Sequence, residues 1–299
     1  MLLALGAAWA ASSAVIASDA VDELAAIRKI NRLGGIIRES AGRPVTIVEF
    51  NLRSPFGDED VPLLKPLENL KSVDFRNTKI IGTHISGAGL RELSSLKHLS
   101  ALSLAKTRIG DGSLRELKEL EHLATLDLSE TQITGVGLKD LRDLQHLTEL
   151  NLAGCQLTNA GMRELGQLKN LEALDLIRTN VKSVGLKELR GLKKLTSLDL
   201  GNTNIRDADL KDLKELKSLT RLDLFETRIT DAGMKEIKEF SNLTILNLTG
   251  TRITHFGLRE IRQLQRLRKI YLGGTLVIES AVQELAGSRP DLYISLSDE

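Results

Sequence analysis

A unit of 24 residues that repeats along most of the chain restricts the fold more than any other feature. Its clearest copy runs from Leu123 to Gln145 and reads LATLDLSETQITGVGLKDLRDLQ. Further copies start at Leu99, Leu147, Leu171, Leu195, Leu219, Leu243 and Leu267. Each start lies 24 residues after the one before it, as in 147 − 123 = 24. A fixed period of this length is typical of stacked repeats, in which each unit contacts mainly its neighbours.

The two halves of the unit predict two different elements. The first half, LATLDL, alternates apolar and polar residues and predicts a short strand, whereas GLKDLRDL places leucines three apart and predicts about two turns of helix. One unit cannot bury a core alone, but stacked units pair their strands and enclose the leucines. We therefore predict an α/β fold, a curved solenoid with a parallel sheet on its concave side and short helices on its convex side.

This pattern resembles the leucine-rich repeat family, and the resemblance extends roughly from Val45 to Leu285. The position after each strand holds Thr83, Thr107, Thr131, Cys155, Thr179, Thr203, Thr227, Thr251 and Thr275. We expect these hydroxyl groups to form a ladder that satisfies backbone groups of the turns. Threonine or cysteine at this position resembles the cysteine-containing repeats of F-box-type proteins, although no F-box-like helical domain precedes the repeats.

The chain divides into four predicted segments. Residues 1–20 carry no charge until Asp19 and are apolar and then rich in small residues, which predicts a secretory signal peptide. A signal peptide implies export to the periplasm, the medium or the cell surface. The alternatives are an uncleaved anchor helix or a wrongly assigned start of the protein. Without export, the protein is expected to be cytoplasmic. Residues 21–44 are predicted as an N-terminal cap, 45–285 as a solenoid of about ten units, and 286–299 as a C-terminal cap.

Composition and motifs argue against several classes of function. Lys and Arg number 41 and Asp and Glu 40, so the net charge gives no reason to expect nucleic-acid binding, and aromatic residues are too few at 3% for base stacking. The sequence lacks the P-loop, the H-E-x-x-H motif and the G-x-S-x-G motif. We therefore expect a non-enzymatic protein with no cofactor and no small-molecule substrate, and a monomer.

Neither the single cysteine nor the histidines predict a chemical site. Cys155 is the only cysteine and is expected to be a buried structural thiol. His98, His122 and His146 occupy one column before successive strands, but other units place Asn170 there or other polar residues. No carboxylate or cysteine joins the histidines at a fixed spacing, so we predict no metal site.

Side chains between the strand leucines point out of the concave face. This column holds Glu49, Asp74, Ser103, Asp127, Asn151, Asp175, Asp199, Asp223, Asn247 and Tyr271. Because neighbouring strands lie about 4.8 Å apart, Asp175, Asp199 and Asp223 form a row of like charges. Two interpretations remain open: the carboxylates are only solvated, or they form an acidic groove for a Lys- or Arg-bearing surface of a protein partner.

Large side chains of the same face complete the predicted site. Phe225 and Tyr271 stand out because aromatic residues are rare in this chain and are frequent binding hot spots, although Phe225 has the alternative of packing against a neighbouring strand. The predicted partner-binding residues are Asp175, Ile177, Asp199, Arg221, Asp223, Phe225, Ile245, Lys269 and Tyr271.

The leading hypothesis is therefore a scaffold that binds a protein on its concave sheet. The resemblance to F-box-type repeats implies an alternative, a substrate-recognition subunit of a multi-protein enzyme such as a ubiquitin ligase. A third hypothesis is a structural or cell-surface spacer, for which a featureless concave face is expected.

Overall fold

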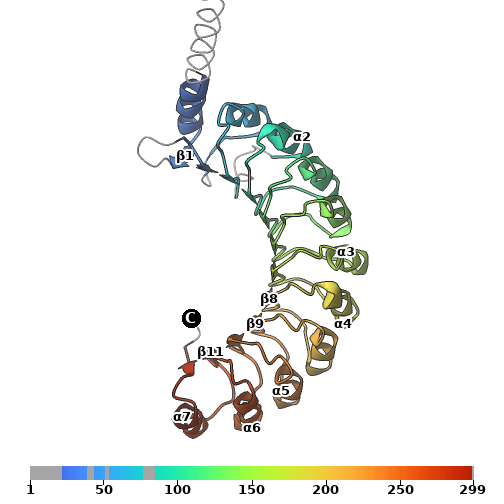
Figure 1. Cartoon of the computed structure of the whole chain (residues 1–299), viewed down its shortest axis with the longest axis vertical. Helices are drawn as coiled ribbons and strands as arrows, with labels where there is room; N and C mark the ends of the chain where they lie inside the picture. The colour runs from blue at the N-terminus through green and yellow to red at the C-terminus, as the bar shows by residue number, and fades with distance from the viewer. Residues whose placement is uncertain (1–21, 39–43, 51–53, 77–84, 298–299) are drawn as a thin grey trace, which may run out of the picture.

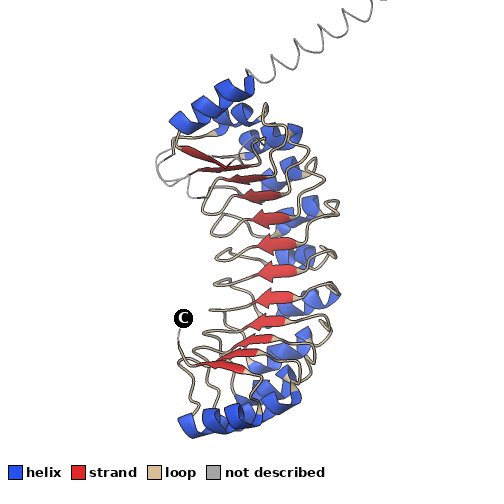
Figure 2. Ribbon diagram, turned by 60° about the vertical axis from the view of Figure 1, so that its left-hand side comes forward, coloured by secondary structure: helices blue, strands red, loops and turns tan. Residues whose placement is uncertain are grey.

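A computed structural model describes residues 22–38, 44–50, 54–76 and 85–297. The chain forms an open arc with the strands on its inner side and the helices on its outer side (Figure 1, Figure 2). This is the predicted curved solenoid. The predicted signal peptide and Thr83 lie outside the described residues.

The strands form one sheet of twelve members whose order in space follows the sequence. They are β1 (Gly35–Arg38), β2 (Ile47–Phe50), β3 (Ser72–Asp74), β4 (Ala101–Ser103), β5 (Thr125–Asp127), β6 (Glu149–Asn151), β7 (Ala173–Asp175), β8 (Ser197–Asp199), β9 (Arg221–Asp223), β10 (Ile245–Asn247), β11 (Lys269–Tyr271) and β12 (Tyr293–Ser295). The strands from β2 onwards pair in parallel, whereas β1 pairs antiparallel with β2. The sheet thus has slightly more strands than the expected ten or so, and β1 departs from the expected parallel pairing.

The convex elements are short helices, of which many are 3-10 rather than α-helical. The α-helices are α2 (Gly87–Glu92), α3 (Asn159–Leu165), α4 (Ser183–Leu186), α5 (Asp231–Ile237), α6 (His255–Leu258) and α7 (Glu279–Ser288), and residues 22–32 are also helical. The 3-10 helices are η1 (Asp58–Leu64), η3 (Leu93–Ser95), η4 (Asp111–Leu117), η5 (Val136–Leu141), η6 (Lys187–Gly191), η7 (Asp207–Leu213) and η8 (Arg259–Gln263). Leucines three residues apart fall on one face of a helix with three residues per turn, which explains why the spacing suits the 3-10 form.

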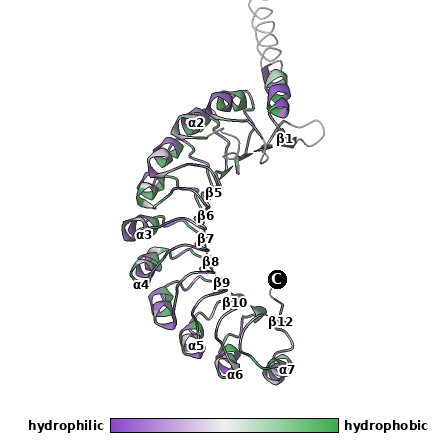
Figure 3. Cartoon of the chain, turned by 180° about the vertical axis from the view of Figure 1, so that it is seen from behind, coloured by the Kyte–Doolittle hydropathy of each residue, from purple (hydrophilic) through white to green (hydrophobic). Residues whose placement is uncertain are grey.

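The leucines form one core that extends along the whole arc between sheet and helices. Leu198 of β8 and Leu210 of η7 are both fully buried, and the same cluster continues from Ile30 to Leu292. The convex helices carry both hydrophobic and hydrophilic residues, as expected for elements with one buried face (Figure 3). Within the described residues, no helix has both the length and the apolar character needed to cross a membrane.

The threonine ladder predicted from the sequence is present. The Thr203 hydroxyl donates to the carbonyl of Leu200 at 2.5 Å, and the other described threonines of the column do the same to the residue three positions before. Cys155 is buried, and its thiol donates instead to the carbonyl of Leu128 at 3.2 Å. Burial raises the pKa of this thiol. The predicted structural role of Cys155 is confirmed.

Glycines at the helix starts allow successive units to approach closely. A Cβ atom at Gly161 would lie 2.2 Å from the carbonyl oxygen of Thr134, and one at Gly137 would lie 2.4 Å from that of Asp111. Side chains then join the units at the same level, since the Asp207 carboxylate accepts from the Thr230 hydroxyl at 2.7 Å. This packing fixes the spacing of the strands on the opposite side.

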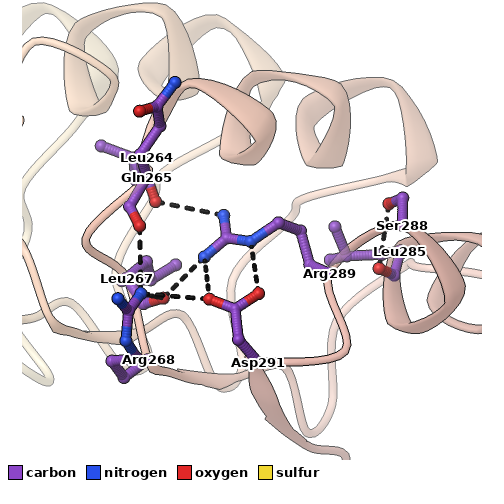
Figure 4. A network of polar contacts seen from close by, with 8 residues as sticks. All are labelled: Leu264, Gln265, Leu267, Arg268, Leu285, Ser288, Arg289 and Asp291. Atoms are coloured by element: carbon purple, nitrogen blue, oxygen red, sulfur yellow. Dashed lines mark hydrogen bonds and ion pairs between the residues drawn. The ribbon is translucent and has the colours of Figure 1, made fainter.

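Both ends of the sheet are closed by non-repeat segments. At the C-terminal end, the Arg289 guanidinium donates to the carbonyls of Leu264 at 3.2 Å and Leu267 at 2.8 Å, and it pairs with Asp291 at 2.9 Å (Figure 4). Arg289 thus ties the C-terminal segment to the turn that precedes β11. At the N-terminal end, the rings of Phe50 and Phe56 lie 4.0 Å apart between centroids. The exact boundaries of the two caps stay predictions.

Candidate binding face on the concave sheet

The concave face is hollowed along its middle by a groove of about 480 Å³. It crosses the strands from β2 to β9, and its lining includes Glu49, Ser72, Asp74, Arg76, Ala101, Ser103, Thr125, Asp127, Glu149, Asn151, Ala173, Asp175, Ser197, Asp199 and Arg221. The groove exists because the first residue of most of these strands is small. Ala101 and Ala173 leave space above the sheet that a longer side chain would fill.

The acidic column has a structural role that the sequence analysis did not identify. In each case Oδ1 of an aspartate or asparagine accepts the backbone N–H two residues later, at 2.8–3.1 Å. The donors are the backbone groups of Arg76, Ser129, Ala153, Ile177, Gly201, Phe225 and Thr249. These are Asx-type turns that stabilise the chain where it leaves the strand. Because Asn151 and Asn247 form the same bond, this turn does not require a negative charge.

The interpretation that the carboxylates of this row are only solvated does not hold for Asp223. Its side chain is buried, at 4% exposure, and accepts from Arg221 at 3.2 Å and from the Asn247 amide at 3.0 Å. This carboxylate therefore already has a cation and an amide as partners within the fold.

Asp175 and Asp199 are half-buried and line the groove. Burial, together with the neighbouring charges of Asp223 and Asp175, raises the pKa of Asp199 to about 7. Burial also raises the pKa of Asp175, and the charges of Asp127 and Asp223 add to this effect. Charge on this row thus costs free energy in the folded protein.

Further acids of the groove extend the charged region towards the N-terminus. Asp127 accepts from the Ser103 hydroxyl at 3.2 Å, and Glu149 accepts from the Thr125 hydroxyl at 3.2 Å. Among the described residues, the ion pairs of the acidic column are Asp74 with Arg76, at 2.5 Å, Asp223 with Arg221, and Glu49 with Arg38. No described lysine or arginine forms an ion pair with Asp127, Glu149, Asp175 or Asp199.

Phe225 packs against the neighbouring unit, which was the alternative to a free hot spot. A Cβ atom at Gly201 would lie 2.0 Å from Cε1 of Phe225, so the ring covers the glycine directly. Phe225 is half-buried in this position. The ring fits there because Gly201 has no side chain of its own.

A cluster of large side chains occupies the C-terminal end of the concave face. The Lys269 ammonium lies 4.8 Å from the ring centroid of Tyr271 and 5.1 Å from that of Tyr293, which are cation–π distances. Ile245 is half-buried on the strand between Arg221 and Lys269. Sequence reasoning missed Tyr293, whose strand lies in the same register beside β11.

The structure divides the predicted site residues into two groups. Asp175, Asp199 and Arg221 line the groove, whereas Ile177, Asp223, Phe225, Ile245, Lys269 and Tyr271 do not. The predicted set omitted the groove residues Asp74, Arg76, Asp127, Glu149 and Asn151. The signal that marks them is the combination of the acidic column with small residues at the first position of each strand.

Metal binding has no support in the part of the chain that the structure describes. No three histidine, cysteine or carboxylate side chains come together there in a way that would hold an ion. The His122 and His146 rings lie 5.6 Å apart between centroids, and both side chains are exposed.

Comparison with known families agrees with the repeat pattern. A leucine-rich repeat family model matches residues 97–157 and 217–277, and a second leucine-rich repeat model matches residues 191–214. The chain is a leucine-rich repeat solenoid. The matched models describe leucine-rich repeats in general and do not assign the cysteine-containing, F-box-type subfamily. The sequence matches none of the curated proteins.

Solved structures of leucine-rich repeat proteins share the fold. An internalin from Listeria monocytogenes superposes with a TM-score of 0.62 at 19% identity and covers 84% of this chain and 67% of its own. Internalin C2 from the same organism has a TM-score of 0.51 at 23% identity, with coverage of 70% and 84%. A chain of the mouse RP105/MD-1 complex has a TM-score of 0.60 at 23% identity, with coverage of 83% and 42%. These likenesses concern the fold.

Proposed function

We propose that this solenoid is a non-enzymatic scaffold that binds a protein partner on its concave sheet. The observation that carries the proposal is the set of carboxylates in the groove that have no cationic partner among the described residues, namely Asp127, Glu149, Asp175 and Asp199. A basic segment of a partner would supply the missing cations and would cover the floor of the groove.

The charges support the proposal because the fold does not need them. Asn151 shows that an amide forms the same Asx-type turn, and the raised pKa of Asp199 shows that ionisation at this position is unfavourable in the free protein. A lysine or arginine from a partner would reverse this penalty, since an opposite charge favours the ionised carboxylate. Electrostatic complementarity of this kind acts strongly on the rate of association.

The C-terminal cluster of Phe225, Ile245, Lys269 and Tyr271 is proposed as a second contact area beside the groove, with Ile177 and Asp223 on the border between them. A chain of this fold takes part in the mouse RP105/MD-1 complex, so a protein partner is compatible with the architecture. No observation on the described residues favours the ubiquitin-ligase alternative. The groove and its charges also make a featureless spacer the weaker hypothesis.

We further propose that the protein is exported and that residues 1–20 are its signal peptide. The support is the apolar segment followed by small residues before Asp19. Sequencing the N-terminus of protein from the native host should give a start between Ala11 and Val21. Recovery of Met1 in a soluble cytoplasmic fraction would contradict export.

Affinity capture with matched variants tests the binding function. The bait is the mature chain, and its groove variant carries Asp127→Asn, Asp175→Asn and Asp199→Asn, which preserve the turns. A control variant removes three charges from the convex side, with Asp140→Asn, Asp143→Asn and Asp212→Asn. A partner that the wild type and the control retain and the groove variant loses supports the proposal. Equal capture by all three baits would place the contact elsewhere.

A further inference from the structure

A recurring pair of side chains joins neighbouring units on the flank where each strand leads into its helix. The carboxylate of Asp207 accepts the backbone N–H of Thr230 in the next unit at 2.8 Å and the hydroxyl of the same residue at 2.7 Å. This aspartate–threonine pair is named the latch. Further latches are formed by Asp231 with Thr254 and by Asp111 with Thr134. Because hydrogen bonds to a charged group are stronger than those between neutral groups, each latch holds two units together firmly.

A backbone hydrogen bond on the same flank accompanies each of these three latches. The N–H of Arg228 donates to the carbonyl of Ile205 at 3.0 Å. Equivalent bonds run from Arg252 to Ile229 and from Gln132 to Ile109. The units of β4 and β5, of β8 and β9, and of β9 and β10 are thus joined in two ways on this flank.

The two interfaces on either side of β7 have no latch. Asn159 and Ser183 stand where the latch has its aspartate, and Lys182 and Arg206 stand where it has its threonine. Among the described residues, neither Asn159 nor Ser183 forms a side-chain hydrogen bond to the following unit. The units of β6, β7 and β8 therefore lack the side-chain connection that joins the units of β8, β9 and β10.

The accompanying backbone bond is also missing at these two interfaces. In this part of the chain, which the structure describes without a gap, the N–H groups of Asn180 and Asn204 donate to no carbonyl of the preceding unit. The N–H of Arg206 donates to the Asp209 carboxylate of its own unit at 2.8 Å, whereas the equivalent N–H of Thr230 donates to the preceding unit. A group that connects two units elsewhere is thus used within one unit here.

Open clefts lie at the same two interfaces, in the middle of the arc near α3 and α4 (Figure 1). A cleft of about 220 Å³ separates the units of β6 and β7, and one of about 440 Å³ separates those of β7 and β8. Lys182 and Arg206 line the larger cleft, and these two like charges disfavour its closing. In the unit of β7, the buried Val181 is smaller than Ile205 and Ile229 of the same column, so less side-chain volume fills the core under this flank.

The concave side of these units stays joined without interruption. The ladder continues from Glu149 through Ala173 to Ser197, as it does along the rest of the sheet. On the helical side, a Cβ atom at Gly185 would meet the side chain of Met162 at 2.8 Å, and methionine is flexible and adapts to small changes in spacing. Units that are joined along one side and open along another form a hinge, whose axis here lies in the sheet at β7.

We propose that the arc bends at the unit of β7, so that two blocks with latches of their own move about the continuous sheet. The N-terminal block holds the latch of Asp111 with Thr134, and the C-terminal block holds those of Asp207 and Asp231. The groove of the concave face crosses β7, so bending changes the curvature of its floor. Bending of this kind requires no partner, so it goes beyond the proposed binding function.

The distance between two spin labels, one in each block, measures the bending. Lys97→Cys and Gln265→Cys place the labels on exposed turns before β4 and β11. The buried native thiol is removed by Cys155→Thr, the residue that most other units have in that column. Double electron–electron resonance on the full chain then gives the distribution of distances. The distribution should be broad, because the two blocks adopt more than one relative orientation.

Building a latch into the hinge should suppress the motion. Asn159→Asp with Lys182→Thr supplies both members between the units of β6 and β7. Gly185 leaves room for the new carboxylate, as Gly233 does where its absent Cβ would lie 2.4 Å from Oδ1 of Asp207. The population of the minor arrangements should fall about tenfold, because two hydrogen bonds to a carboxylate favour the closed flank. Lys182→Thr alone is the matched control, since it supplies no carboxylate, and should leave the distribution as broad as before.

Removing an existing latch provides the opposite test. Asp207→Ala with Thr230→Ala opens the flank between the units of β8 and β9, so it should broaden the distribution further. A narrow distribution in the labelled protein without latch substitutions overturns the hinge. So does a built latch that narrows nothing, or a control that narrows the distribution as much as the complete latch. If the variant with the built latch does not fold, a broad starting distribution that latch removal broadens supports the hinge, and one that it leaves unchanged overturns it.

Discussion

The middle and the C-terminal end of the concave face have the same backbone arrangement. They differ in whether their charged side chains have partners within the protein. From β3 to β8, small residues stand beside carboxylates, and the result is a groove with unpaired charge. From β9 to β12, large side chains fill the face and pair with one another. Arg221 binds Asp223 there, and Lys269 lies near Tyr271 and Tyr293. Only the middle therefore keeps polar groups that gain a partner on binding.

This difference shows which positions of the repeat the fold determines and which it leaves variable. The buried leucines, the threonine ladder and the Asx-type turns are the same in both regions. The variable positions are the first residue of each strand and the choice of aspartate or asparagine in the acidic column. A change at these positions alters the surface without a change in the backbone, which is how repeat proteins acquire binding specificity.

The largest expected effect tests whether the two regions share one core. Leu198 lies under the groove and Leu246 under the C-terminal end, and both are fully buried. Leu198→Ala and Leu246→Ala should each lower the free energy of unfolding by about 2–5 kcal/mol, because each leaves a cavity. Chemical denaturation of the two variants checks this. Lys211→Ala, an exposed convex change, is the control and should be nearly neutral. A much smaller loss for Leu246→Ala would mean that the C-terminal end is not part of the same cooperative unit.

The sequence predicts the core well because the repeat restricts it strongly. The period places every strand, and the register of two neighbouring strands follows directly, as in Leu174 beside Leu198. The antiparallel pairing of β1 with β2 and the 3-10 form of several helices are not visible in the pattern. They depend on how the N-terminal segment meets β2 and on how few residues each unit leaves for its helix.

The binding face is less predictable because it depends on distances between side chains of different units. The sequence places Asp223 in the acidic column, but its burial follows from contacts with Arg221 and Asn247 on two strands. Likewise, the sequence places Phe225 on the concave face but does not show that its ring packs on Gly201. The position of the groove depends on the combined volume of the side chains on three neighbouring strands, and not on the identity of one residue.

The next effect concerns the packing of Phe225 on Gly201, which separates the filled end from the groove. Ala105 and Ala153 occupy the position of Gly201 in other units, so the backbone accepts a Cβ there. Gly201→Ala should nevertheless destabilise the protein by about 1–3 kcal/mol, because the new methyl group meets the ring. A double-mutant cycle with Phe225→Ala, followed by urea denaturation, should show that the loss from Gly201→Ala disappears when the ring is absent. Additive losses would show that the ring does not depend on the glycine.

A smaller effect should appear in the pH dependence of stability. The folded-state pKa of Asp199 is raised to about 7 from an ordinary 3.8, so the folded protein holds a proton there that the unfolded chain has lost. Stability should therefore fall as the pH rises from about 4 to above 7. Asp199→Asn keeps the turn and removes the charge, so it should stabilise the protein by about 1–2 kcal/mol at pH 8 and have little effect at pH 4. Thermal unfolding at both pH values measures this.

Asp212→Asn serves as the control for that measurement, because this aspartate lies on the convex side. It should change stability by the same small amount at pH 4 and pH 8. If Asp199→Asn also shows no dependence on pH, the middle of the concave face carries no electrostatic penalty. The groove and the C-terminal end would then not differ in the free-energy cost of their charged side chains.

The smallest expected effect distinguishes the two regions by the kinetics of binding to a captured partner. Asp175→Asn removes an unpaired charge from the groove, so it should slow association about two- to fivefold at low salt and flatten the dependence on salt. Tyr271→Ala removes contact area at the end of the face and should leave association unchanged while speeding dissociation by a similar factor, equivalent to about 1 kcal/mol or less. Surface plasmon resonance at several salt concentrations separates the two rates. If Tyr271→Ala and Asp175→Asn change the same rate constant, the groove and the C-terminal end act as one contact surface.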